Sequence, residues 1–212
     1  MFRTLTISLV LILVTGTGMI QGKVNQQEER SRRQLQVRIY DYAHVSPESL
    51  AEAKSVASSI FQKIGVEILW LDHASGGNPD QAIHNGQSSY PQLQLRILNL
   101  QMAERLPVNK HMTGLTFQGT GGQVGRVANI FYNRVEELAR SKTCSKGAIL
   151  AHAAAHEIAH LLLGNVDHSP AGLMKAQLGH KELQSAARGH LVFLESEAEQ
   201  IRKALAEPRV QP

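Results

Sequence analysis

The sequence of 212 residues contains only one cysteine, Cys144. An exported protein with a single thiol has no internal disulfide, so its stability comes from packing and from any bound metal. Aromatic residues make up 5% of the chain, and the formal net charge is +4 with the basic residues scattered. These features give little basis for nucleic-acid binding. The chain also lacks internal repeats, so its function has to be sought in particular residues.

The N-terminal segment lacks an apolar run long enough for a typical transmembrane helix. Leu5 to Ile20 is largely apolar and follows Met1-Phe2-Arg3, but residues 15–18 (TGTG) interrupt it. A short basic start followed by an apolar stretch is typical of a secretory signal. We therefore expect residues 1–22 to be a signal peptide, with an uncleaved membrane anchor as the alternative. The protein would be secreted or extracytoplasmic, and it would touch a membrane only through an uncleaved N-terminal segment.

Downstream of the signal the composition predicts one domain between two short polar segments. Residues 23–34 (KVNQQEERSRRQ) are charged and polar, which indicates a linker or a short pro-segment. Residues 35–207 are enough to bury a substantial core as one domain. Residues 208–212 form a tail.

Alternating and helical apolar patterns divide this domain into strands and helices. Ser46 and Pro47 are a typical helix start, and Gly65 is a typical end. Helices packed on one twisted, mostly parallel sheet of four to five strands, an α+β class, account for the order of elements. The expected strands are 36–40, 66–71, 93–100 and 126–132, and the expected helical segments are 47–64, 135–140, 146–163, 181–188 and 195–206.

Two segments are expected to be loops. Residues 72–92 are rich in turn formers, and residues 114–125 (GLTFQGTGGQVG) are too rich in glycine for a firm core element. The second segment is not a nucleotide-binding loop, because Gly125 comes one place too late for G-x-G-x-x-G and no helix follows. We expect a mobile loop near a cleft there. The next strand, 126–132, is then the candidate edge strand over the cleft, where a peptide adds as a further strand.

The motif HEIAH at residues 156–160 is the most specific feature of the sequence. His156 and His160 lie one turn apart on one helix face, so both imidazoles can bind one zinc ion. Glu157 is the candidate general base toward a water bound to that ion. A catalytic zinc site needs a third protein ligand. Gly164 can end the helix, and His168 can then turn back to supply that ligand.

A helix with satisfied core histidines is the alternative interpretation of this motif. The helix is strongly apolar, with residues 148–150 before the motif and 161–163 after it. Burying two histidines and a glutamate there without a partner is costly, which favours a metal. His152 continues the row at a spacing of four, but it lies about 12 Å from His160 along the helix axis. We therefore expect His152 to be a packing residue rather than a ligand.

These residues resemble a known family. HEIAH, the following glycine and the run DHSPAGLM are similar to the metzincin zinc metallopeptidases, and the run itself to the matrix-metallopeptidase branch, over residues 156–174. The resemblance implies a metzincin-like single domain with a zinc-binding active-site helix, a Met-turn and C-terminal helices. It also implies His156, His160 and His168 as ligands and Glu157 as general base. Met174 would lie in the turn beneath the metal.

The spacing differs from the family pattern HExxHxxGxxH. Gly164 comes one residue late, His168 comes two residues late, and Val166 stands where the third ligand is normally found. Asp167 is the rival third ligand. A glutamate on a later helix, such as Glu182, would fit a thermolysin-like plan.

The sequence thus predicts a zinc-dependent metallopeptidase that uses Zn²⁺ and Glu157 to hydrolyse a peptide or protein substrate. The alternative is a non-catalytic extracytoplasmic zinc-binding or interaction domain of the same fold. A metal-free interaction protein is a third interpretation. A fourth protein ligand that closes the site would favour the non-catalytic domain, whereas an open position favours the enzyme.

Overall fold

The computed structural model describes residues 33–72, 91–106, 112–116, 126–165 and 167–206. These residues form an α+β arrangement with one five-stranded, mostly parallel sheet and six helices, which confirms the predicted class. The strands are β1 (Gln34–Asp41), β2 (Glu67–Asp72), β3 (Gln92–Leu98), β4 (Gly114–Thr116) and β5 (Val127–Phe131). The helices are α2 (Pro47–Gln62), α3 (Leu100–Ala103), α4 (Tyr132–Ala139), α5 (Lys146–Leu163), α6 (His180–Ala187) and α7 (Glu195–Ala206).

The sheet has the order β2-β1-β3-β5-β4. Strand β1 pairs in parallel with β2 and β3, and β3 pairs in parallel with β5. Only β4 runs antiparallel to its neighbour, β5. Parallel neighbours need a long connection, and α2 provides it between β1 and β2. Along β1, the alternate residues Leu35, Val37 and Ile39 are buried in the main core, as a sheet covered on that face requires.

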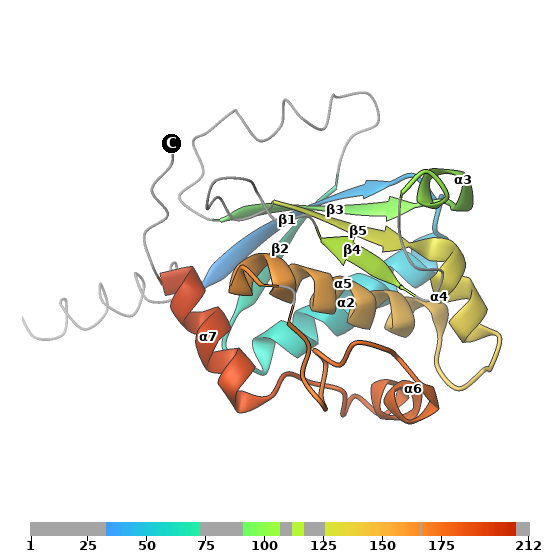
Figure 1. Cartoon of the computed structure of the whole chain (residues 1–212). Helices are drawn as coiled ribbons and strands as arrows, with labels where there is room; N and C mark the ends of the chain where they lie inside the picture. The colour runs from blue at the N-terminus through green and yellow to red at the C-terminus, as the bar shows by residue number, and fades with distance from the viewer. Residues whose placement is uncertain (1–32, 73–90, 107–111, 117–125, 166, 207–212) are drawn as a thin grey trace, which may run out of the picture. The chain divides into compact units, whose positions relative to one another are not determined.

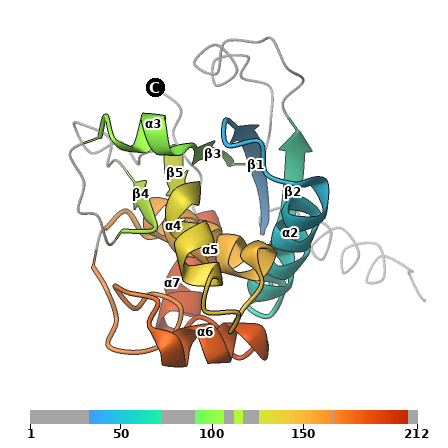
Figure 2. The ribbon, with the colours of Figure 1, turned by 90° about the vertical axis from the view of Figure 1, so that its right-hand side faces the viewer.

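Helix α5 is the centre of this part of the chain. It contacts β3, β4 and β5 on one side and also α2, α4, α6 and α7. Both views place α2 and α5 side by side against the same face of the sheet, with α6 and α7 beyond α5 (Figures 1 and 2). A helix covered on all sides has to be apolar almost all round, and 15 of its residues are buried. Polar side chains on α5 are therefore exceptions that need a reason.

Two predictions about the sheet were wrong. Residues 114–116 are not a loop but strand β4, and the predicted edge strand, 126–132, is the internal strand β5. The prediction failed because β4 is a three-residue strand that exists through its antiparallel pairing with β5. The glycine content of the segment indicated a loop instead. Helix α3, of four residues, was not predicted at all. The position of β4 at the edge, against α5, is what makes it relevant to the site.

Several predictions lie outside the described residues. They concern the signal peptide (1–22), most of the linker (23–34), the loop at 73–90, the glycine-rich residues 117–125, Val166 and the tail (208–212). Strand β1 already includes Gln34, the last residue assigned to the linker. In the part of the chain that the structure describes, no helix is both long and apolar enough to cross a membrane.

Candidate metal centre

Helix α5 has clear boundaries at both ends, and they match the predicted range of 146–163. At its start, the Ser145 hydroxyl accepts a hydrogen bond from the backbone N–H of Ala148 (3.1 Å). At its end, Gly164 adopts a left-handed conformation (φ 68°) and donates to the carbonyl of His160 (3.0 Å). This conformation costs glycine little, and it ends the helix four residues after His160. The chain can then turn back toward the helix.

The turn brings three histidines together. His156 and His160 on α5 and His168 in the following loop offer ligand nitrogens that all lie within 4.8 Å of one another. Their ring centroids are separated by 4.6, 5.2 and 5.0 Å. The rival ligands are not members of this cluster: Asp167 is exposed, and Glu182 pairs with Lys175.

Backbone carbonyls fix the tautomers of the two helix histidines. Nδ1 of His156 lies 2.9 Å from the carbonyl oxygen of Leu173, and Nδ1 of His160 lies 3.0 Å from that of Asn165. A carbonyl oxygen can only accept, so each Nδ1 carries the proton. Burial lowers the pKa of His156 to about 4 and also lowers the pKa of His160, and the nearby histidines add to both shifts. Both rings are therefore neutral at pH 7, and each Nε2 presents a lone pair.

These two lone pairs face each other. The Nε2 atoms of His156 and His160 are 3.0 Å apart with no proton left to share. Two nitrogens bound to one tetrahedral zinc ion are about 3.3 Å apart, given zinc–nitrogen bonds of about 2.0–2.1 Å. A cation between them replaces repulsion with coordination, and neutral imidazole is the form that binds metals. The donor set and its orientation thus fit a metal ion.

The loop after α5 contains the other two residues that the motif suggested. Met174 is buried (1% exposed), and its carbonyl accepts a hydrogen bond from the N–H of Ser169 (2.9 Å). This bond closes the loop that begins at His168. Leu173, beside Met174, supplies the carbonyl that orients His156. The loop therefore both carries one histidine of the cluster and orients another.

Glu157 points toward the sheet edge. It is 6% exposed, and its Oε2 accepts a hydrogen bond from the Thr116 hydroxyl on β4 (2.7 Å). Burial raises the pKa of Glu157 to about 7, and the bond from Thr116 opposes that shift. Gly114 leaves room for this side chain, since a Cβ there would lie 2.6 Å from Cγ of Glu157. Gly114 and Thr116 were not predicted as site residues, because no local signal in the sequence connects them with Glu157.

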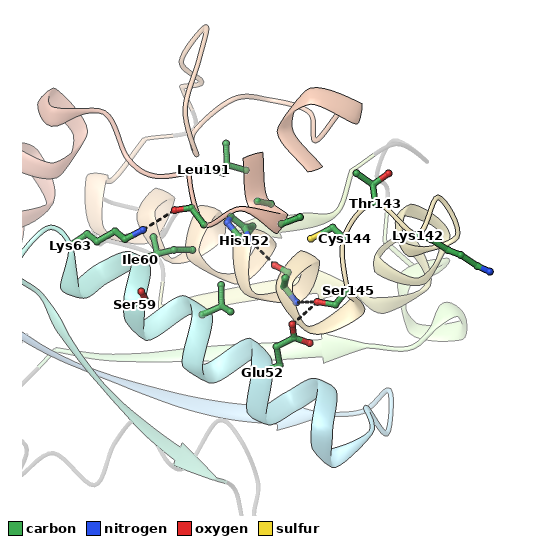
Figure 3. Close-up of a pocket in the computed structure, with 15 residues that line it drawn as sticks. Glu52, Ser59, Ile60, Lys63, Lys142, Thr143, Cys144, Ser145, His152 and Leu191 are labelled. Atoms are coloured by element: carbon green, nitrogen blue, oxygen red, sulfur yellow. Dashed lines mark hydrogen bonds between the residues drawn. The ribbon is translucent and has the colours of Figure 1, made fainter. Parts of the chain in front are cut away.

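His152 lies outside the three-histidine cluster, as predicted. It is 1% exposed, and its Nδ1 donates to the carbonyl of Ala148 (2.7 Å). Burial lowers its pKa, although hydrogen bonding to backbone groups opposes the shift. It lines a cavity of about 410 Å³ between α2, α5 and the segment around Leu191 (Figure 3). Cys144 lines the same cavity, and burial raises the pKa of its thiol, which disfavours the reactive thiolate.

Neither protein-family models nor curated proteins match this chain. The metzincin resemblance therefore rests on residues 156–174, and the case for a metal site rests on the geometry of the three histidines.

Proposed function

We propose that this protein is a secreted or extracytoplasmic zinc metallopeptidase with a metzincin-like fold. The observation that carries the proposal is the convergence of three imidazoles. The Nε2 atoms of two of them, His156 and His160, lie 3.0 Å apart with their lone pairs facing each other. His156, His160 and His168 would hold the metal. Three imidazole nitrogens suit zinc and leave a coordination position for a substrate or water. Gly164 and Met174 would support this site from the helix end and the following turn.

A bound zinc ion supplies Lewis-acid chemistry: it polarises a peptide carbonyl and lowers the pKa of water toward neutrality. The residues of this chain supply the rest. Glu157 is adjacent to His156 on α5 and is the general base that takes the proton of the attacking water and returns it to the leaving amine. A carboxyl group with a pKa near 7 suits such two-way proton transfer.

The position of β4 at the edge of the sheet is an argument for a peptide or protein substrate. Strand β4 is the edge strand, and its Thr116 contacts Glu157 directly. An extended peptide that adds to β4 on the side away from β5 would gain main-chain hydrogen bonds and lie beside this carboxyl group. We therefore place the expected peptide-binding edge at β4 rather than at β5.

One observation favours a second candidate function, a non-catalytic zinc-binding domain. Glu157 is 6% exposed and its carboxyl group is bonded to Thr116, as would be expected of a purely structural residue. On this alternative the purified protein binds about one zinc ion per chain but cleaves no peptide in a mixed peptide pool.

The deciding experiment is the substitution Glu157→Gln. We expect it to lower kcat by about 10²–10⁴-fold while zinc remains bound, because the amide keeps the shape but takes no proton. Cleavage of a peptide pool and zinc content are measured on the same samples. Glu136→Gln is the matched control, since Glu136 pairs with Lys146 at an exposed position and is not one of the residues proposed for the site. If E157Q cleaves as fast as the parent, the general-base assignment is wrong.

A further inference from the structure

The histidine in the loop differs from the two on α5 in how it is held. His168 is exposed, and among the residues that the structure describes none makes a hydrogen bond to its imidazole. His156 and His160 each have a carbonyl partner. The position of His168 therefore depends on the backbone of its loop.

The neighbouring residue, Ser169, fastens that backbone at two points. Its N–H donates to the carbonyl of Met174 (2.9 Å), and its hydroxyl donates to Oε1 of Glu197 in α7. The first bond closes the loop on itself. The second ties the loop to a helix 28 residues further along the chain.

Glu197 both caps the start of α7 and binds the loop through Ser169. It occupies the third position of α7, and its Oε2 accepts a hydrogen bond from the N–H of Leu194 (2.8 Å), which is the usual capping arrangement. Such a cap needs one carboxyl oxygen and works at an exposed position. Glu197, however, is only 6% exposed, and its second oxygen is used by Ser169. A buried carboxyl group needs these partners, because an unsatisfied one costs free energy.

The segment before α7 holds the same loop at a second place. The N–H of Leu173 donates to the carbonyl of Val192 (2.9 Å), and the carbonyl of Leu173 orients His156. Gly172 makes this close approach possible. It has a positive φ of 76°, and a Cβ there would lie 3.1 Å from the oxygen of Val192. The loop is thus fastened to residues 192–197 at both of its ends.

We infer that Ser169 and Glu197 are positioning residues for His168, so that the metal affinity of the site depends on the first turn of α7. The inference rests on the proposed metal centre. It concerns the hydrogen bond between Ser169 and Glu197, neither of which is a proposed metal ligand. Without the Ser169–Glu197 bond the loop samples more conformations, and His168 loses part of its preorganisation toward the two helix histidines.

The test is a double-mutant cycle between Ser169 and His168. Affinity for Zn²⁺ and for Co²⁺ is measured by competition with a chelator for the parent, S169A, H168A and S169A/H168A. We expect S169A to weaken zinc binding about 10-fold, at the lower end of the range for groups that orient ligands. In the H168A background it should have no further effect, because Ser169 then has no ligand to position. S169T keeps the hydroxyl and should restore most of the affinity.

Stability measurements separate positioning from general damage. Urea unfolding in excess chelator measures the stability that S169A loses with its bond to the buried Glu197, and zinc affinity is compared only under conditions in which the parent, S169A and S169T are fully folded. E197Q should weaken zinc binding like S169A, although it also weakens the cap of α7, so S169A is the decisive variant. Equal losses in the His168 and H168A backgrounds, or no loss in S169A, would overturn the inference alone. A parent that binds neither ion would overturn the metal centre and the inference with it.

Discussion

At Gly114 the absence of a side chain shapes the surroundings of Glu157. A Cβ there would lie 2.6 Å from Cγ and 2.7 Å from Oε1 of Glu157, which is too close for either group to stay in place. We expect Gly114→Ala to displace the carboxyl group and to lower kcat for peptide cleavage at least 10-fold, a loss within the range for a misplaced general base. Zinc content should not change, since the three atoms nearest to the added Cβ all belong to Glu157 and none to a histidine.

The matched control for this variant is Gly189→Ala. Gly189 has a positive φ of 69° and no atom within 4 Å of the place where a Cβ would lie, so alanine there adds backbone strain without a clash. Stability should fall in this control while kcat stays at the parent value. A G114A variant that cleaves peptides with the parent's kcat would show that the position of Glu157 is not critical for the proposed activity.

The place of a single residue in the site could be predicted where it depends only on neighbouring residues in the sequence. The spacing of His156 and His160 follows from helix geometry alone, so their convergence could be predicted from the motif. His168 could be separated from Asp167 only by the path of the backbone after Gly164. Thr116 could not be connected with Glu157 at all, because 41 residues separate them and a strand pairing brings them together.

At the scale of elements, local patterns determine the helices better than the strands. Helix α5 has the predicted bounds because Ser145 and Gly164 are typical boundary residues on either side of an apolar run. Strand β4 has three residues and is defined by its pairing with β5, so nothing within the segment reveals it. The same pairing moves β5 from the predicted edge to the interior of the sheet.

The N-cap of α5 is also tied to a second helix, which leads to a prediction. The Ser145 hydroxyl accepts from the N–H of Ala148 and donates to Oε1 of Glu52 in α2 (2.6 Å). The Ser46 hydroxyl that caps α2 accepts from the N–H of Ser49 and donates to the Ser49 hydroxyl, so both of these bonds stay within the first turn of α2 at an exposed position. We expect S46A to lower the free energy of unfolding by about 1 kcal/mol. S145A should cost more, by roughly 1 kcal/mol for the lost bond to Glu52.

Urea unfolding of both variants without metal measures this difference. Working without metal keeps any change in zinc affinity out of the comparison. If S46A costs as much as S145A, the bond between α2 and α5 contributes nothing measurable.

At the scale of the whole molecule, the strand order decides what the central helix can do. The order β2-β1-β3-β5-β4 places three strands against α5 and puts the glycine-containing β4 beside Glu157. The sequence indicated a sheet covered by helices but not this order, which depends on pairings between distant segments. The α+β class was therefore predictable, whereas the edge strand was not.

The proposed metal ion should also stabilise the whole described domain, because the three histidines that would bind it come from α5 and from a loop that α7 holds. A ligand that binds only the folded state adds about 2.7 kcal/mol when its free concentration is about a hundred times Kd. For a domain of this size we expect Tm to rise by roughly 5–10 °C in zinc relative to excess chelator. A reductant should leave Tm unchanged, since Cys144 is the only cysteine of the chain. H168A should lose most of the rise, because two histidines bind zinc more weakly than three. An equal Tm for the parent in zinc and in chelator, measured by calorimetry, would mean that the three imidazoles do not hold the ion.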